Sequence, residues 1–283
     1  MLSVVIITKN EAKNVAICLD SLQGIADEII VIDSFSTDET REISLKYGAL
    51  FFQREWNGYS EAKNFGNDKA QYDWILSIDA DEALSPELRK SILALKAPAV
   101  PELVEGIEGI EGGALTGGST GSTSSPTVSP TVKVEPSHYF YTFNRLTNYC
   151  GQWIRHGGWY PDTKLRLFDR RIARWQGDFA HETLVVQDTI KPIRLKGDLY
   201  HYSFNSIEQH VDKVNKYSSL IAAERLSQGR TGSAFKMIFG PIATFFKFYI
   251  IKTGFLDGRN GFIIAVISAY DNFLRSAKMR GRG

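Results

Sequence analysis

The chain has 283 residues, of which 43% are hydrophobic and 23% are charged, and its net charge at pH 7 is +1. This globular composition can build one large domain or two small ones, and the near-neutral charge argues against a general nucleic-acid binder. The two cysteines, Cys18 and Cys150, form no disulfide framework and fit a reducing compartment, although a single bridge between them stays open. Residues 1–7 lack a basic leader and a small-residue cleavage site, so we expect a protein that is not secreted.

The first eighty residues alternate between two hydrophobic patterns. Short apolar runs predict strands at 2–7, 25–32, 49–53 and 74–78, and β-branched runs such as 2–7 are typical of strands covered on both faces. The segments between them predict helices over 12–22, 40–47 and 60–69. This alternation indicates a parallel sheet with right-handed crossovers, and ligands bind such sheets beyond the carboxyl ends of the strands.

The fourth apolar run ends at three carboxylates in four positions, Asp79, Asp81 and Glu82. Asp79 and Asp81 point the same way if the strand geometry persists, because side chains alternate faces along a strand. Two hard oxygen ligands at a strand end suit Mg²⁺ or Mn²⁺ with positions left for phosphate oxygens. The alternative is a solvated turn before a helix that begins at Ser85 and Pro86.

Polar side chains also follow the other strands of this predicted sheet. Asn10 and Glu11 follow the first strand and Asp33 ends the second. The Asp33 carboxylate would accept the imide N–H of a uracil, Glu11 would hold ribose hydroxyls, and Lys63 would approach a phosphate or the base. Each residue alone also fits a loop, a cap or a solvated helix face, but the joint arrangement favours a nucleotide site.

Four segments, at 3–11, 30–38, 62–66 and 78–82, together resemble glycosyltransferase family 2, and the match is close over 1–95. The resemblance implies a GT-A fold, a Rossmann-like mixed α/β sheet with helices on both faces, and inverting transfer from a nucleotide sugar. It assigns nucleotide-sugar binding to Thr8, Asn10, Glu11, Asp33, Ser36, Lys63 and Asp79. Lys63 stands where many relatives carry Arg, so bidentate recognition is lost there.

Residues 97–137 break the pattern with a low-complexity tract of Gly, Ser, Thr, Pro and Glu. Such a composition buries too little apolar surface to offset the entropy of ordering, so we predict a disordered insertion. An acceptor-binding lid is the less favoured alternative.

The middle of the chain supplies candidates for the acceptor side. Residues 153–162 are rich in aromatic residues and glycine, which suits either a sugar-stacking loop or a well-packed turn. Residues 164–169 alternate like a strand. Within it, Arg166 would face either a diphosphate or the solvent.

A second acidic centre lies at 174–182. Inverting transfer needs one general base to take the proton of the acceptor hydroxyl. Glu182 occupies the place where family 2 enzymes commonly put an acidic base, and the His181–Glu182 pair resembles the lipopolysaccharide-core β-glucosyltransferase branch. Asp178 is the second candidate base. His181 would orient the base or contact phosphate. A salt bridge at a strand end is the alternative reading of the pair.

A downstream histidine is a third metal ligand in many GT-A enzymes, so the resemblance makes His201 a ligand candidate beside Asp79 and Asp81. A structural histidine between two tyrosines is the alternative, and the more common one.

The C-terminal third is helical and apolar. A helix is predicted over 206–227, and 235–251 and 261–273 are apolar runs flanked by Lys and Arg. Neither run is long enough to favour a spanning helix. Amphipathic helices on an anionic membrane surface, and helices that close the core or a dimer interface, fit equally. We therefore expect a catalytic domain at 1–205 and a helical extension at 206–283.

Together these features predict a metal-dependent inverting hexosyltransferase with Mg²⁺ or Mn²⁺ as cofactor. The donor would be a UDP-hexose, first of all UDP-glucose, and the acceptor a lipopolysaccharide-core or other glycolipid. We expect a cytoplasmic protein on the inner face of the cytoplasmic membrane. The alternatives are a polyprenyl-phosphate sugar transferase and a non-catalytic nucleotide-sugar-binding protein.

Overall fold

A computed structural model of the chain describes residues 1–97, 140–177, 182–186 and 191–281. Apart from Ala97, the predicted insertion at 97–137 lies outside the described residues. The elements of the first part are β1 (Leu2–Thr8), α1 (Ala12–Leu22), β2 (Glu28–Asp33), α2 (Thr40–Lys46), β3 (Leu50–Gln53), α3 (Tyr59–Lys69), β4 (Trp74–Asp79), β5 (Glu82–Leu84) and α4 (Pro86–Lys96). Those that follow are β6 (Tyr141–Tyr149), β7 (Gln152–Ile154), β8 (Asp162–Asp169), β9 (Ala173–Gln176), β10 (Thr183–Val186), β11 (Ile193–Phe204), α5 (Ile207–Ser227), α6 (Ala234–Phe246), a π-helical turn η2 (Lys247–Ile251), a 3₁₀ turn η3 (Gly254–Asp257) and α7 (Gly258–Arg280).

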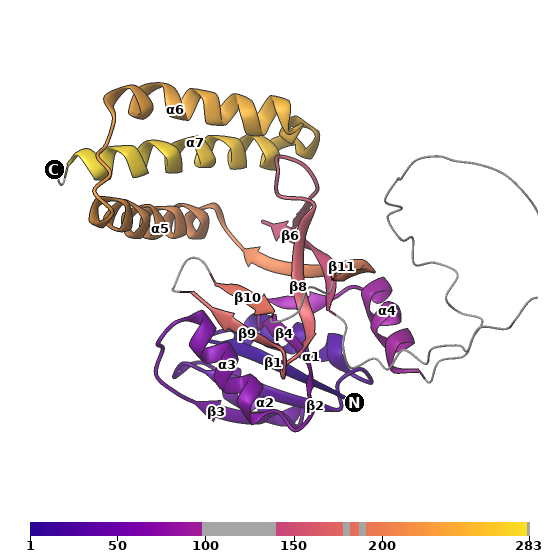
Figure 1. The fold of residues 1–283 in the computed structure, drawn as a ribbon. Helices are drawn as coiled ribbons and strands as arrows, with labels where there is room; N and C mark the ends of the chain where they lie inside the picture. Colours follow the sequence, from indigo (N-terminus) through magenta and orange to yellow (C-terminus); the bar gives the residue numbers. More distant parts are fainter. Residues whose placement is uncertain (98–139, 178–181, 187–190, 282–283) are drawn as a thin grey trace, which may run out of the picture.

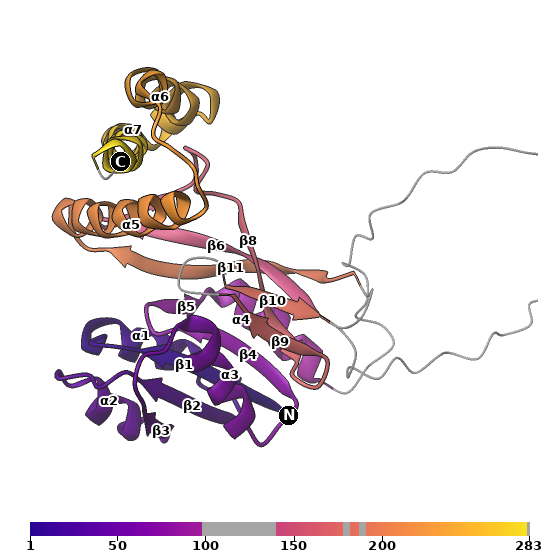
Figure 2. The same ribbon diagram turned by 60° about the vertical axis from the view of Figure 1, so that its left-hand side comes forward.

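The main sheet of the described residues runs in the order β3-β2-β1-β4-β8-β6-β11-β5, with β7 paired to β6. The strands β3, β2, β1 and β4 are mutually parallel, whereas β8 is antiparallel to both β4 and β6. Strand β11 is parallel to β6 and antiparallel to β5. Figures 1 and 2 show the helices covering this sheet from both sides. The predicted mixed α/β sheet is confirmed.

Strand β1 is buried along its whole length because helices cover both of its faces. Val4 and Ile6 pack in the cluster that includes α1 and α4, while Val5 and Ile7 pack in the cluster that includes α3. Burial of each such side chain stabilises the fold by roughly 1.5–3 kcal/mol. The rigid centre of the sheet therefore fixes the strand ends that carry the polar residues.

The second strand begins three residues later than the sequence predicts. Ile25 is fully buried, but its N–H donates to the carbonyl of Leu22 in the turn that closes α1. Pairing with β1 starts only at Glu28, opposite Ser3. An apolar residue packed under a turn has the same hydrophobic signature as a strand residue, which explains the early boundary.

Helix α3 lies close to the sheet because Gly66 faces it. A Cβ atom at this position would collide with the side chains of Val5 and Ile32. One turn earlier on the same helix, Lys63 is consequently held against the carboxyl edge of the sheet, where it has no exposed surface.

The C-terminal helices form a stack beyond the sheet (Figures 1 and 2). Helix α7 packs against α6 on one side and α5 on the other. The predicted helix over 206–227 is confirmed, and the Ser206 hydroxyl caps it by accepting the N–H of Gln209. Helix α5 thus lies between the pair of helices α6 and α7 and the sheet.

His210 of α5 is buried among aromatic rings, and its Nδ1 lies 3.1 Å from the Tyr149 hydroxyl. Burial, helped by the nearby Lys213, lowers the pKa of His210 to about 4. The unfolded chain therefore takes up this proton near pH 6.5, while the folded protein stays unprotonated until about pH 4. We expect His210 to make the free energy of unfolding fall as the pH drops from about 6.5 to about 4, by up to about 1.4 kcal/mol per pH unit. Above pH 6.5 the histidine is neutral in both states, so it adds no pH dependence there.

Urea unfolding of the parent and of His210→Gln between pH 4 and 8 measures this contribution. The stability difference between the two proteins should shrink or reverse below pH 6.5. A difference that does not change with pH would assign the acid sensitivity to other groups.

Candidate active site

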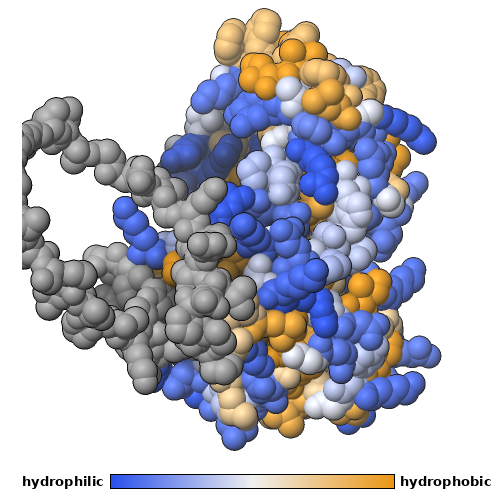
Figure 3. Space-filling model, turned by 90° about the vertical axis from the view of Figure 1, so that its right-hand side faces the viewer, coloured by the Kyte–Doolittle hydropathy of each residue, from blue (hydrophilic) through white to orange (hydrophobic). Residues whose placement is uncertain are grey.

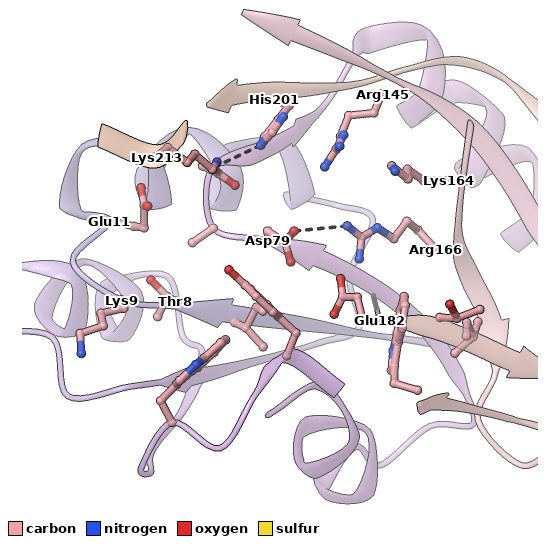
Figure 4. A pocket seen from close by; sticks show the side chains of 18 of the residues that line it. Thr8, Lys9, Glu11, Asp79, Arg145, Lys164, Arg166, Glu182, His201 and Lys213 are labelled. Atoms are coloured by element: carbon pink, nitrogen blue, oxygen red, sulfur yellow. Dashed lines mark hydrogen bonds and ion pairs between the residues drawn. The ribbon is translucent and has the colours of Figure 1, made fainter. Parts of the chain in front are cut away.

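A cleft of about 1140 Å³ opens at the carboxyl ends of β1 and β4 and extends to α5. Figure 4 shows the polar side chains that converge on it from both sides. They come from the end of β1 and the loop after it, from β4, β6, β8 and β11, from the segment before β10 and from α5. The labelled members are Thr8, Lys9, Glu11, Asp79, Arg145, Lys164, Arg166, Glu182, His201 and Lys213.

The sheet register aligns the strand ends. Thr8 at the end of β1 is paired with Asp33 at the end of β2, and Ile7 is paired with Asp79 at the end of β4. Carboxyl ends of neighbouring parallel strands meet at one edge, which is where open α/β sheets bind ligands. The cleft lies at this edge.

Lys63 links two of the predicted acidic residues. Its Nζ lies 2.7 Å from Oε1 of Glu182 and 3.2 Å from Oδ1 of Asp79, and it stands 4.7 Å from the centre of the Trp175 ring. A buried ammonium group is stable only when it is paired. Asp79 and Glu182 provide this pairing for Lys63. The contact with a phosphate or a base that the sequence predicts for Lys63 stays a prediction.

Arg166 occupies the other side of Asp79. Its Nη2 lies 3.2 Å from Oδ2 of Asp79 and 3.6 Å from Oε1 of Glu82. Burial alone would favour a neutral Asp79, but Lys63 and Arg166 outweigh it and hold the pKa of Asp79 below its usual range. Asp79 is accordingly charged at neutral pH, with a cation beside each oxygen.

Six buried polar atoms of residues that line the cleft make no hydrogen bond within the described ranges, and four of them lie on Glu182, Arg166 and Trp175. Oε2 of Glu182 is an acceptor, and the donors are Nε and Nη1 of Arg166 and Nε1 of Trp175. An unsatisfied buried group costs about 1–3 kcal/mol, so such groups are rare and need an explanation. A ligand that offers both hydrogen-bond donors and acceptors would satisfy all four.

Asp81 is brought to His201 by the pairing of β5 with β11. His201 lies opposite Glu82 in this ladder, and the N–H of Tyr202 donates to the carbonyl of Asp81. As a result, Nε2 of His201 lies 3.3 Å from Oδ2 of Asp81, although the two residues are 120 positions apart in the sequence. The resemblance-based prediction had grouped the same two residues.

A divalent cation fits this pair. Mg²⁺ is usually bound through one or two carboxylates together with waters and substrate phosphates, so Asp81 and His201 at an open cleft need no third protein ligand. Within the described residues, no cluster of three His, Cys, Asp or Glu side chains is arranged as a metal site. The metal, and the ligand role of Asp79, therefore stay predictions.

Glu11 lines the cleft, and its Oε2 accepts a hydrogen bond of 2.7 Å from the Asn14 amide. Burial, followed by the charges of Asp81 and Asp38, raises the pKa of Glu11 above its ordinary value. The structure thus places Glu11 in the cleft, and the ribose contact predicted for it stays a prediction.

Three other predicted nucleotide-binding residues hold loops together instead of lining the cleft. Asp33 is fully buried and accepts the N–H and hydroxyl of Ser36, whose Oγ accepts the N–H of Asn10. The Asn10 amide oxygen in turn accepts the N–H of Thr37 at 2.8 Å. This network joins the loops after β1 and β2 next to the cleft, and the uracil contact of Asp33 stays a prediction.

Glu82 and Arg145 are parts of the site to which sequence analysis gave no role. Glu82 is fully buried, where its Oε2 accepts the N–H of Asp79 at 2.9 Å and its Oε1 lies 3.4 Å from Nη1 of Arg145. Glu82 is part of the acidic run after β4, and this run could have pointed to a role for it. Arg145 lies inside an ordinary strand, and nothing local distinguished it.

One face of α5 was also missed. Lys213, Lys216, Tyr217 and Leu220 line the cleft, at intervals of three, four and seven residues that place them on a single helical face. In the part of the chain that the structure describes, neither lysine is paired with a carboxylate. Asp178 and His181, the other predicted participants in proton transfer, lie outside the described residues.

Comparison with known proteins identifies the family. The model of "Glycosyl transferase family 2" matches residues 3–100. An uncharacterised glycosyltransferase of Rickettsia prowazekii is 33% identical over 287 aligned residues, which cover 99% of this chain and 86% of the relative. The chain belongs to glycosyltransferase family 2. The lipopolysaccharide core biosynthesis glycosyltransferase LpsC of Rhizobium meliloti is 28% identical over 99% of this chain and 92% of that one.

Solved structures match less completely than these family 2 relatives. Glucosyl-3-phosphoglycerate synthase of Mycobacterium tuberculosis, in complex with Mn²⁺, UDP and glucosyl-3-phosphoglycerate, is 28% identical over 34% of this chain and 38% of that one, with a TM-score of 0.28. S. aureus TarS covers 78% of this chain and 39% of that one at 14% identity and a TM-score of 0.41. Family 2 membership, not these superpositions, carries the assignment: the chain is a glycosyltransferase with a GT-A fold, as its motifs predicted.

Proposed function

We propose that the protein is an inverting, metal-dependent hexosyltransferase that moves glucose from UDP-glucose to a lipopolysaccharide-core or other glycolipid acceptor. Membership of family 2 implies a nucleotide-sugar donor. The similarity to LpsC, which is named for lipopolysaccharide core biosynthesis, supports the acceptor class. The observation that carries the mechanism is that the buried Oε2 of Glu182, in the cleft, has no hydrogen-bond partner among the described residues.

Glu182 is the general base of this proposal. The acceptor oxygen attacks the anomeric carbon on the face opposite the diphosphate, its proton passes to Oε2 of Glu182, and the bond from the anomeric carbon to the phosphate oxygen breaks to release UDP. A single base serves such an in-line displacement, which inverts the anomeric centre. Lys63 holds Oε1 of Glu182 at 2.7 Å and so fixes the carboxylate in place.

We expect the leaving diphosphate to bind between Arg166 and the Asp81–His201 pair. Nε and Nη1 of Arg166 have no hydrogen-bond acceptor in the described part of the chain, and charge-assisted hydrogen bonds to phosphate are strong. Mg²⁺ or Mn²⁺ held by Asp81 and His201 would neutralise charge that develops on the diphosphate. The Trp175 ring lies beside Lys63 and Arg166, and its Nε1 has no acceptor among the residues that the structure describes. This apolar wall with one donor suits a sugar ring.

One feature favours a second acceptor class. Lys213 and Lys216 face the cleft without an acidic partner in the described part of the chain, and an acceptor phosphate would pair with them. A polyprenyl phosphate attacks through an ionised oxygen and needs no strong base. The two acceptor classes therefore differ in their dependence on Glu182.

Donor selection is tested by thermal unfolding with a panel of nucleotide sugars, with and without Mn²⁺. A ligand that binds only the folded state at a hundred times its Kd stabilises that state by about 2.7 kcal/mol, so UDP-glucose with Mn²⁺ should raise Tm by several degrees. GDP- and CMP-sugars should do less, and EDTA should abolish the shift. Release of UDP that depends on a glycolipid acceptor then establishes transfer. A protein stabilised by UDP-glucose that never turns it over would be the non-catalytic binder.

A further inference from the structure

The outward face of α6 is apolar along its whole length. Neither α6 nor the η2 turn that continues it has a buried residue. The side chains that are at least half exposed include Phe235, Ile238, Phe239, Ile242 and Phe246 of α6 and Ile250 of η2. These positions recur at three- and four-residue intervals and so form a single stripe. Figure 3 shows hydrophobic side chains gathered at the end of the molecule where α6 lies.

The turn after η2 and the helix α7 add to the same exposed apolar surface. Leu256 is 59% exposed and Phe262 is 48% exposed. We call the α6 stripe together with Phe255, Leu256, Phe262, Val266, Tyr270 and Phe273 the hairpin face. Soluble monomers rarely expose contiguous apolar patches of more than a few hundred Å², and larger ones mark interaction sites.

The charge around the hairpin face indicates which kind of partner it binds. Residues 234–281 contain seven Lys and Arg but only two Asp, in a chain whose net charge is +1. Asp257 is buried and accepts the N–H groups of Arg155 and His156, so it does not offset the surface charge. Lys236, Lys247, Lys252 and Arg259 are exposed and have no carboxylate partner within the described ranges. Apolar side chains ringed by unpaired cations are complementary to an anionic lipid surface.

A position on the bilayer surface fits better than a membrane span. Ala234–Ile251 is the one helical stretch among the described residues that is long and apolar enough to cross a membrane. It includes Lys236 and Lys247, and Gly240 packs against the Asn272 amide of α7. A spanning α6 would carry these polar groups into the hydrocarbon, whereas a helix in the interface keeps the lysines at the headgroups.

We infer that α6 and α7 lie in the surface of an anionic bilayer through the hairpin face. Helix α5 packs on α7 and lines the cleft with its opposite face. Helix α5 therefore lies between the cleft and the pair of helices in the bilayer surface, which sets the cleft about one helix diameter, on the order of 10 Å, from that pair. This inference concerns where the enzyme sits, and its test does not depend on sugar transfer.

Flotation of the full-length protein with vesicles tests the inference directly. We expect binding to vesicles of phosphatidylcholine and phosphatidylglycerol at 3:1 to exceed binding to pure phosphatidylcholine by about tenfold or more, and to weaken in high salt. Phe239→Asp combined with Phe246→Asp should lower the bound fraction at least about tenfold. Lys236→Gln, Lys247→Gln and Lys252→Gln together should remove the preference for phosphatidylglycerol.

The matched control is Leu45→Asp with Leu50→Asp, two exposed leucines on α2 and β3 at the far end of the molecule from α6. This variant adds the same charge and should float like the parent. Equal loss of binding in both double variants, or a hairpin variant that floats normally but changes from dimer to monomer in light scattering, would overturn the inference. In the second case the hairpin face would be a contact between copies of the chain.

Discussion

Glu182→Gln is expected to transfer sugar to a hydroxyl acceptor about 10²–10⁴ times more slowly than the parent enzyme, because a positioned general base contributes that factor. The amide keeps the shape of the side chain and can still accept from Lys63, but it cannot take the acceptor proton. The donor should bind as before, since the base acts on the acceptor. Initial rates of UDP release should therefore show a lower kcat, with the Tm shift by UDP-glucose and Mn²⁺ unchanged.

Glu42→Gln, an exposed position on α2, is the matched control and should keep the parent rate. The acceptor class decides between the two proposed reactions. A Glu182→Gln protein that glycosylates a polyprenyl phosphate at full rate would favour the phosphate acceptor. If the same variant retained full transfer to a hydroxyl acceptor, Glu182 would not be the base.

The parallel part of the sheet, β1 to β4, was predictable because its signals are local. Apolar runs and helical spacing in the first eighty residues indicated β1 to β4 and the helices between them, and the order of strands and helices indicated one ligand-binding edge. The acidic run after β4 then pointed to Asp79 and Asp81, which the structure places at that edge. Such inferences need only the periodicity of the chain and the geometry of parallel sheets.

The partners of these residues were not predictable from local pattern. The contact between Asp81 and His201 depends on β11 pairing antiparallel to β5, and no spacing rule specifies that register. Lys63 reads as an ordinary helix-surface lysine, yet the close approach of α3 at Gly66 buries it beside Glu182. Both arrangements follow from tertiary packing.

Asp33 shows the limit of arguing from a strand end. Its position was predicted correctly, but its oxygens accept hydrogen bonds from Ser36 and Gln53 in the neighbouring loop and strand. Asp and Ser side chains readily bond to nearby backbone, so a polar residue at a strand end can face a ligand or hold a loop. Sequence alone does not separate these roles.

The cleft also extends well beyond the part of the chain that the family model matches. Residues 3–100 supply Glu11, Asp79 and Asp81, whereas Arg166, Glu182 and His201 follow later in the chain. The matched part carries the donor-side carboxylates, and the remainder supplies the proposed base and most of the cations. Acceptor specificity is therefore expected to reside in the segments after residue 140.

Asp81→Asn is expected to lower kcat/KM by about three orders of magnitude, because a metal ion contributes several kcal/mol of charge stabilisation and each 1.36 kcal/mol is a factor of ten. Unlike Glu182→Gln, this variant should also lose most of the Mn²⁺-dependent part of the Tm shift by UDP-glucose. Titration with Mn²⁺ at fixed donor concentration measures the loss of metal affinity directly. Asp68→Asn, whose exposed ion pair with Arg174 is worth little, is the control of equal charge change.

His201 provides the sharper form of this test. If Asp81 and His201 hold the same ion, His201→Gln should weaken Mn²⁺ dependence as well, and the double variant should lose little more than Asp81→Asn alone, since residues that act as a unit are not additive. Additive losses would mean that the two side chains act separately and that their 3.3 Å contact is only structural. Full transfer by Asp81→Asn in the presence of EDTA would remove the metal from the mechanism and leave Arg166 as the cation proposed to face the diphosphate.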